Sequence, residues 1–271
     1  VSRPDEDSVA LFLKKFLPES LVYALIRFKN VYIQQSLFKR VRAFPDRSKK
    51  FLIDQVKKEL PDFDVDKHFT PSYNPWEQRM CLIPNSDFFN AIKDKSATVV
   101  TDHIEAFEEN GIKLKSGDFL EADIIVTATG LVLQNFGGVN ISVNNNPVKV
   151  SETMTYKSLM YSDIPNFVNS FGYINASWTL KADLTSTYLC RLIKHMDQNN
   201  YLSACPKKPL DVDETYDWLK DFSSGYIQRS IGLHPQQGSK KPWVNYQDYI
   251  KDWFDVKFSK LEDGNLVFSK D

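Results

Sequence analysis

The sequence E-A-D-I-I-V-T-A-T-G-L at residues 121–131 decides the expected fold. Its centre is an unbroken apolar run, Ile124-Ile125-Val126, and its end is rich in small residues. A short β-branched run without polar alternation is typical of a strand covered on both faces, as in a parallel sheet. Ligands of open α/β sheets bind beyond the carboxyl ends of such strands, and Gly130 would permit a close approach. Taken alone, these residues fit an ordinary buried strand that ends in a turn.

Charge balance, cysteine spacing and the lengths of the apolar runs exclude several classes of protein. The 271 residues include 34 Lys and Arg against 35 Asp and Glu, without a block of like charge. This balance argues against nucleic-acid or membrane-surface binding by bulk electrostatics. The cysteines form no C-x-x-C pair and the histidines are scattered, so we expect no disulfide framework and no metal site. No run approaches the roughly 18 apolar residues of a membrane span, which makes the cytoplasm the expected compartment.

Residues 7 to about 60 are predicted to be helical. Apolar residues recur there at broadly helical spacing, and Asp7 or Ser8 can cap the start. Pro18 and the step Phe44-Pro45-Asp46 divide the region into about three segments. We interpret its basic cluster as a solvated helix face rather than an anion site; the cluster comprises Lys39, Arg40, Arg42, Arg47, Lys49 and Lys50.

Aromatic residues and prolines fill residues 61–84 and predict a packed, shaped loop. Arg79 stands where this loop enters the apolar run Met80-Cys81-Leu82-Ile83. Its stem can pack there while neighbours hold the guanidinium. From spacing alone, a structural salt bridge, for instance with Glu77, explains this arginine better than catalysis does.

A β-meander is predicted before the opening stretch. Residues 87–92 indicate a short helix and residues 98–101 a strand. Asn110-Gly111 signals a hairpin between residues 104–107 and 112–114, and residues 116–118 make a second turn. Beyond Gly130, the asparagine run 144–146 punctuates another β region.

Residues 163–196 predict a strand, a glycine turn and a helix. The strand covers 167–171, Gly172 turns the chain, and Asn175 or Ser177 caps the helix. Such a helix start presents free amides and partial positive charge to a ligand, although any βα unit has the same pattern. The apolar face of the helix carries Leu180, Leu184, Tyr188 and Leu192. Further on, residues 212–222 predict a helix and residues 236–243 a basic loop.

Four collinear segments resemble the class B flavoprotein monooxygenases, and most closely their Baeyer–Villiger branch. They read H-F-T-P-S-Y-N-P-W-E-Q-R-M-C-L-I-P-N-S-D-F-F, T-D-H-I-E-A-F, A-D-I-I-V-T-A-T-G-L and G-Y-I-N-A-S-W-T-L-K-A-D-L. The resemblance implies an α/β fold: the carboxyl-terminal part of a Rossmann-like flavoprotein with two dinucleotide-binding domains and a helical insertion. Neither Gly-rich phosphate loop nor the FxGxxxHxxxWP fingerprint occurs in this sequence. The implied division is a helical insertion and loop at 1–74, the end of the NADPH domain at 75–124, and the returning FAD domain at 125–271.

The resemblance also assigns site residues. Arg79 matches the arginine beside the flavin, which stabilises the negatively charged peroxyflavin; a permanently charged donor suits that task. Gln78 stands where many relatives have a lysine for the extra phosphate of NADPH, so that recognition is left to residues outside this chain. The other implied cofactor-binding residues are Thr129 and Gly130 at the domain crossover, and Gly172, Asn175, Ala176 and Ser177 near the flavin ring.

The implied function is an FAD- and NADPH-dependent monooxygenase. Its partners would be molecular oxygen and a small ketone, thioether or thioamide, oxidised through a peroxyflavin. Two alternatives stay open. One is a flavin-dependent pyridine-nucleotide reductase, although the missing C-x-x-C pair argues against its dithiol type. The other is an inactive fragment, because a chain without either phosphate loop lacks the main groups that hold FAD and NADPH.

Overall fold

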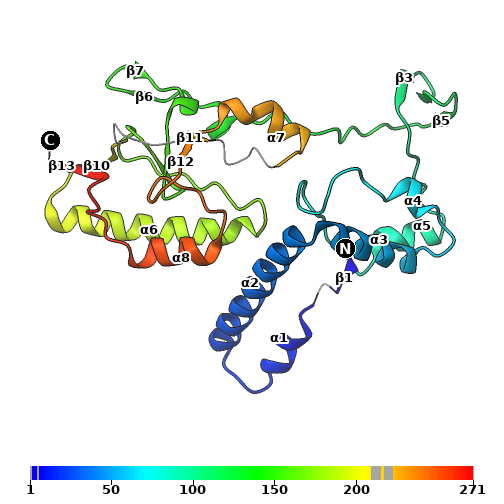
Figure 1. Cartoon of the computed structure of the whole chain (residues 1–271), viewed down its shortest axis with the longest axis horizontal. Helices are drawn as coiled ribbons and strands as arrows, with labels where there is room; N and C mark the ends of the chain where they lie inside the picture. Colours follow the sequence, from blue (N-terminus) through cyan, green and yellow to red (C-terminus); the bar gives the residue numbers. More distant parts are fainter. Residues whose placement is uncertain (1, 5, 209–214, 217–221, 271) are drawn as a thin grey trace. The chain divides into compact units, whose positions relative to one another are not determined.

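Two units make up the chain in the computed structural model, which describes residues 2–4, 6–208, 215–216 and 222–270 (Figure 1). Unit 1 comprises Val1–Ile26 and Arg40–Leu131, and unit 2 comprises Arg27–Lys39 and Val132–Asp271. Both units combine helices with small sheets, so the expected α/β composition is confirmed at this level. The six described sheets have two or three strands each.

Three helices open the chain, as the apolar spacing predicts. They are α1 (Ser8–Leu13), α2 (Glu19–Ala43) and α3 (Pro45–Glu59). The Asp7 side chain accepts hydrogen bonds from the amides of Val9 and Ala10, at 3.0 and 3.2 Å, and so caps α1. Pro18 directly precedes α2, and Pro45 is the first residue of α3. A proline is tolerated at both positions because a helix start requires no amide hydrogen there.

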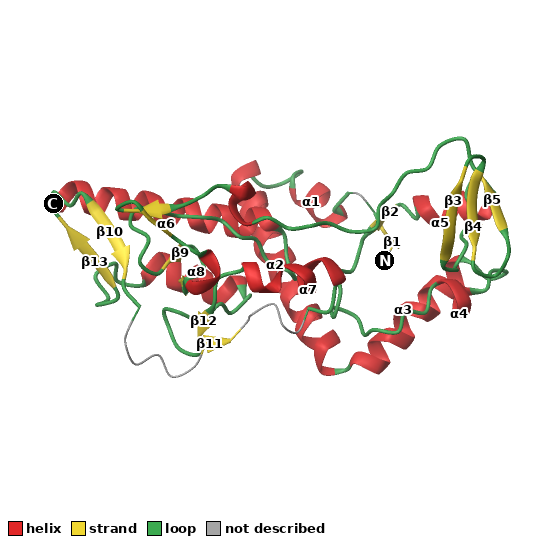
Figure 2. Cartoon of the chain, turned by 90° about the horizontal axis from the view of Figure 1, so that it is seen from above, coloured by secondary structure: helices red, strands yellow, loops and turns green. Residues whose placement is uncertain are grey.

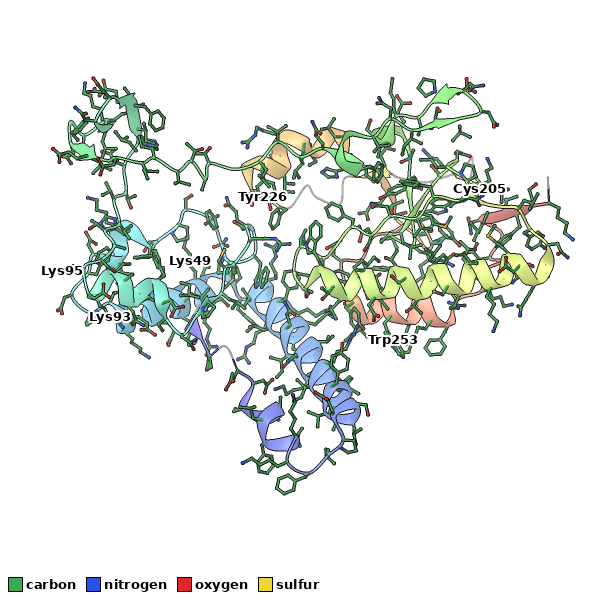
Figure 3. All side chains as sticks on the ribbon, turned by 180° about the vertical axis from the view of Figure 1, so that it is seen from behind. Lys49, Lys93, Lys95, Cys205, Tyr226 and Trp253 are labelled. Carbon is green, nitrogen blue, oxygen red and sulfur yellow. The ribbon has the colours of Figure 1, made fainter. Side chains whose placement is uncertain are left out.

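The core of unit 1 lies where α3 meets α4 (Val65–His68) and α5 (Asp87–Lys93). Lys93 on α5, labelled in Figure 3, donates to the last residue of α3, Glu59, at 3.1 Å. A short parallel pair, β1 (Ser2–Arg3) with β2 (Ile83–Pro84), also belongs to this unit. The buried core residues are Leu60, Val65, Phe89 and Ile92.

The predicted β-meander forms a three-stranded antiparallel sheet. Its strands are β3 (Ile104–Glu108), β4 (Gly111–Leu114) and β5 (Phe119–Glu121). Because Glu108 pairs with Gly111, the turn consists of Glu109 and Asn110, one residue earlier than predicted. The prediction of a strand at residues 98–101 is wrong, since these residues belong to no described strand.

The predicted buried strand at residues 121–131 is not formed. β5 ends at Glu121, and the residues that follow it are drawn as a loop in Figure 2. Ile124 and Val126 are 82% and 85% exposed. A strand requires neighbours that accept and donate ladder hydrogen bonds, and no described residue pairs with this run. The β-branched sequence has strand propensity but lacks a partner, so the expectation is wrong for this structure.

Unit 2 is built on α6 (Trp178–Asn199) and α8 (Tyr249–Phe258), which pack side by side (Figure 1). The predicted apolar face of α6 is confirmed, because Leu184, Tyr188 and Leu192 are buried and Leu180 packs against the same core. The paired strands are β6 (Ser142–Val143) with β7 (Asn146–Pro147), β8 (Thr155–Tyr156) with β9 (Met160–Tyr161), β10 (Ser203–Pro206) with β13 (Leu266–Ser269), and β11 (Thr215–Tyr216) with β12 (Gln237–Gly238). The remaining helices are α7 (Gly225–Ser230) and the 3₁₀ turns η1 (Asn135–Gly138), η2 (Val150–Glu152) and η3 (Ile231–Leu233).

Other expectations for unit 2 have mixed outcomes. Asn144 and Asn145 form the turn between β6 and β7 with positive φ, as asparagine tolerates. The predicted strand at 167–171 is absent from this described stretch. The predicted helix at 212–222 lies mainly outside the described residues, and its described pair 215–216 is a strand. Within the described ranges, no helix is long and apolar enough to cross a membrane.

A buried tyrosine is expected to make unit 2 less stable as the pH rises into the alkaline range. Burial raises the pKa of Tyr161 to about 12 from the ordinary 10.0, although a hydrogen bond from Asn169 opposes the shift. The unfolded chain therefore loses this proton first, and the stabilisation present below pH 10 is lost as the pH rises through about 12.

Chemical denaturation across this range measures the effect. Tyr161→Phe should make the alkaline decline of the unfolding free energy shallower than in the unmodified chain. Tyr32→Phe, at an exposed tyrosine of the same unit, should leave the slope unchanged. Equal slopes for both variants would contradict the assignment.

Candidate functional site

A cleft of about 760 Å³ lies in unit 1 beside the predicted catalytic arginine. One wall comes from the inward face of α3, with Ile53 and Val56, and another from Arg79, Met80 and Cys81. Phe51, Leu52, Phe69, Pro71, Tyr73, Pro75 and Phe89 supply most of the remaining apolar and aromatic lining. Such a cleft can hold the apolar body of an organic ligand.

The charged groups of the cleft are mostly cationic. Lys49, Lys67 and Arg79 line it, against one carboxylate, Glu59. Lys93 and the Ser86 hydroxyl each donate to Glu59 at 3.1 Å, and these hydrogen bonds, the one from Lys93 first, lower the pKa of its carboxyl group. The carboxylate is thus engaged by groups beside the cleft, and the lining favours a ligand that carries negative charge.

Arg79 follows a tightly held turn. The Glu77 carboxylate accepts from the Asn74 amide at 2.8 Å and from the Asn74 side chain at 3.1 Å. These bonds, the backbone one first, lower the pKa of Glu77. Trp76 has a positive φ of 69°, and Gln78 forms a β-bridge with Pro75. Both Glu77 oxygens are therefore used in closing the turn that leads to Gln78 and Arg79.

Lys49 was missed as a lining residue. The sequence assigned it to a solvated helix face, whereas it is half-buried and lines the cleft; Figure 3 labels it in unit 1. It precedes Ile53 and Val56 by four and seven residues, so all three share one face of α3. That spacing is the signal that could have identified it.

The segment before α6 holds the predicted flavin-binding residues of unit 2. Asn175 is only 6% exposed. Its side-chain amide donates to the Gln247 carbonyl at 2.9 Å, and the Gln247 side chain accepts from the Ile174 amide at 2.9 Å. Its backbone carbonyl accepts from Gln34 at 3.3 Å. The Asn175 Oδ1 atom is buried and has no hydrogen-bond partner among the described residues.

The helix begins where predicted, with Ser177 as the residue before its first turn. The Ser177 side chain makes no capping bond to the backbone; its hydroxyl instead contacts the Thr179 hydroxyl at 2.7 Å. The first amides of a helix lack a partner four residues earlier, although the Leu180 amide donates to the Ser177 carbonyl at 3.2 Å. The helix dipole adds partial positive charge at this end. An unpartnered acceptor on Asn175 and amides of the first turn fit a ring that bears both N–H and carbonyl groups, as flavin does.

Gly172 is required for close packing rather than for a turn. A Cβ atom at this position would lie 2.2 Å from Cγ of Trp178, the first residue of α6. Real Cβ atoms do not approach ring atoms so closely, so a side chain here must displace either the indole or the backbone.

Gly172→Ala is therefore expected to destabilise the fold by about 1–3 kcal/mol. The tryptophan fluorescence should also change as the Trp178 ring moves. Gly232→Ala is the matched control, because an added Cβ there meets nothing within 4 Å. An unchanged denaturation midpoint for Gly172→Ala would contradict the packing argument.

The remaining predicted residues differ in exposure. Thr129 and Gly130 belong to the loop after β5, where Gly130 has a φ of 112°. Ala176 is half-buried and packs against the main core of unit 2, whereas Ser177 is exposed. The structure thus brings Gln78 and Arg79 together in unit 1, and Gly172, Asn175, Ala176 and Ser177 together in unit 2.

Comparison with known proteins finds relatives that are named FAD-containing or FAD-binding monooxygenases. The chain is 44% identical over 272 residues to the FAD-containing monooxygenase EthA of Mycobacterium tuberculosis, and this match covers 100% of the chain and 55% of EthA. It is 43% identical over 270 residues to EthA of Mycolicibacterium smegmatis, covering 99% of the chain and 55% of the relative. It is 40% identical over 271 residues to AlmA of Acinetobacter baylyi, which is named a probable FAD-binding monooxygenase. This match covers 99% of the chain and 54% of AlmA. No family model matches.

The resemblance to flavoprotein monooxygenases is thus confirmed over the whole chain. The chain spans about half the length of the curated relatives it matches.

Proposed function

We propose that this chain forms part of an FAD- and NADPH-dependent monooxygenase, which oxidises a small ketone or a sulfur- or nitrogen-containing compound. The observation that carries the proposal is the position of Arg79. It lines a cleft of about 760 Å³ in unit 1, together with apolar walls and two lysines. The similarity to monooxygenases along the full chain supports the same reaction class.

Arg79 acts in this proposal as a fixed positive charge. Its guanidinium is a planar, forked donor that carries a positive charge. A hydrogen-bond donor already held in place stabilises negative charge that develops during a reaction, at no cost of reorganisation. The Asn74–Glu77 turn fixes the backbone two residues before Arg79 and so restricts the directions its side chain can take.

Bound FAD would supply the activation of molecular oxygen, with NADPH as the reductant. In unit 2, the Asn175 Oδ1 atom would accept a hydrogen bond from the flavin ring, and the first amides of α6 would donate to it. Thr129, Gly130, Gly172, Ala176 and Ser177 complete the proposed cofactor-binding set. Gln78 carries no positive charge for the extra phosphate of NADPH, so the proposal leaves that contact to other residues.

The proposed fold is Rossmann-like, divided into an insertion at 1–74, the end of an NADPH domain at 75–124 and an FAD domain at 125–271. This proposed fold gives the run Ile124-Ile125-Val126 a strand partner. The partner corresponds to the part of the relatives that this chain does not match. The exposure and β-branched sequence of the run support this pairing, because unpaired apolar backbone is a ready partner for a strand. The chain contains no Gly-rich phosphate loop, so we expect it to be inactive when isolated.

A chimaera tests the proposal. This chain replaces the matched 55% of M. tuberculosis EthA, and the purified product is examined by visible absorption spectroscopy beside the isolated chain. The chimaera should show the absorption bands of stoichiometric bound flavin, and the isolated chain should show none. A folded chimaera that cannot be loaded with FAD, under conditions that load EthA itself, would overturn the proposal.

A further inference from the structure

A second cavity lies entirely within unit 2 and has a volume of about 220 Å³. It is bounded by the β8–β9 hairpin, η1, residues 169–171, the start of α6 and residues 234–235. Its floor is buried and consists of Thr155, Ser158, Tyr161 and His234. Exposed residues at its edge include Ser170 and Trp178, so the cavity is accessible from solvent.

Aromatic rings form two walls of this cavity. The Phe136 and Tyr161 rings meet edge to face with centroids 5.4 Å apart. The centroid of the Phe171 ring lies 5.4 Å from that of Trp178 and 5.8 Å from that of His234. Rings arranged in this way present faces and edges to a flat guest, and aromatic contacts of both kinds are favourable.

The polar lining groups with printed partners are engaged within the protein. The Asn169 side chain donates to the Tyr161 hydroxyl at 2.9 Å, and the Asn135 side chain donates to a backbone carbonyl. The Asn245 Oδ1 atom accepts from the amide of Gln247 at 3.3 Å and from its side chain at 3.1 Å. The Ser158 hydroxyl differs, because it is buried and has no partner among the described residues.

The backbone holds Ser158 in an unfavourable conformation. Lys157 and Ser158 have φ values of 51° and 59° in the loop between β8 and β9. Non-glycine residues adopt such values only where the surroundings impose them. Lys157 is anchored by Asp263 at 3.2 Å and by the Ser259 hydroxyl at 3.1 Å. This anchor keeps the loop in place, and with it Ser158 as a lining residue of the cavity.

We propose that this cavity binds a small, flat, uncharged aromatic molecule whose single hydrogen-bonding group pairs with the Ser158 hydroxyl. The rings select a flat guest, and an unpaired buried hydroxyl has the free energy of a hydrogen bond to gain. No Asp, Glu, Lys or Arg lines the cavity in the described chain, so a charged ligand would be left without a counter-ion. The site goes beyond the proposed oxygenation, because binding there requires neither FAD nor NADPH.

Benzamide is a suitable probe, since it combines one aromatic ring with one amide group. Its binding to the 271-residue chain can be followed by titration calorimetry. Ser158→Ala should weaken binding about tenfold, which corresponds to one neutral hydrogen bond. The same variant should be as stable as the unmodified chain or more so, because it removes a buried hydroxyl that no protein group satisfies. Ser158→Gly, which relieves the positive φ, should weaken binding equally.

Thr185→Val is the matched control. Thr185 lies on α6, and its hydroxyl is also buried without a partner, but it does not line the cavity. This variant, like Ser158→Ala, should be at least as stable as the unmodified chain, and it should bind benzamide normally. The proposal is overturned if benzamide does not bind, or if it binds the Ser158 variants as tightly as the unmodified chain. It is also overturned if riboflavin displaces benzamide, because the cavity would then belong to the cofactor.

Discussion

Arg79→Ala in the EthA chimaera is expected to lower the oxygenation rate by roughly a hundredfold or more while FAD still binds. The loss follows from the removal of a prepositioned donor, which typically costs two to three orders of magnitude in rate. Flavin binding should survive, because Arg79 is not among the proposed flavin contacts, of which Gly172, Asn175, Ala176 and Ser177 belong to unit 2. Product formation and the flavin spectrum, measured on the same sample, separate the two effects.

Two further variants sharpen this test. Arg79→Lys should recover part of the rate, since it restores the charge without the planar, forked donor. Lys113→Ala removes a cation from β4 that is paired with Glu105 at 3.3 Å, away from the cleft lining, and should leave the rate unchanged. Normal oxygenation by Arg79→Ala would withdraw Arg79 as the catalytic residue.

Lys181→Met should destabilise the chain by about 3–5 kcal/mol, the typical cost of leaving one member of a buried ion pair behind. Lys181 on α6 is 1% exposed, and its Nζ atom lies 2.8 Å from Oδ2 of Asp252 on α8. The Tyr173 hydroxyl donates to the same oxygen at 2.7 Å. The variant therefore leaves a buried carboxylate with a neutral donor in place of its cation. Urea denaturation measures the change.

The controls separate charge from packing. Lys207→Ala breaks an exposed pair with Asp163 and should cost at most about 1 kcal/mol. Lys181→Met combined with Asp252→Leu should recover much of the loss, because a well-packed apolar pair can replace a buried ion pair. A cost for Lys181→Met no larger than that for Lys207→Ala would show that the pair contributes little.

The helices could be predicted from the sequence because their signals are local. Asp7 and Pro45 mark helix starts through contacts within one turn, and the buried face of α6 repeats every three to four residues. The predictions of strands at 98–101, 121–131 and 167–171 were wrong because the signals for a strand are not local. A strand depends on distant partners, and apolar composition alone does not supply them.

The candidate site likewise combines features that the sequence reveals with features that depend on distant packing. The resemblance singled out Arg79 and Asn175, yet the cleft beside Arg79 depends on how α3 packs, and Asn175 is fixed by Gln247, 72 positions away. Ser158 carried no signal at all, since serine is not a residue that marks positive φ. Its importance appears only once its buried hydroxyl is seen to lack a partner.

The most direct measurement of the central claim is the origin of the oxygen atom in the product. The chimaera is supplied with NADPH, isotopically labelled molecular oxygen and methyl phenyl sulfide, a simple thioether, and the product is analysed by mass spectrometry. The account predicts a sulfoxide that carries one labelled oxygen atom, with NADPH consumed in step. Oxidation of NADPH by the flavin-loaded chimaera without labelled product, while EthA itself forms it, would contradict the account and favour a flavin-dependent reductase.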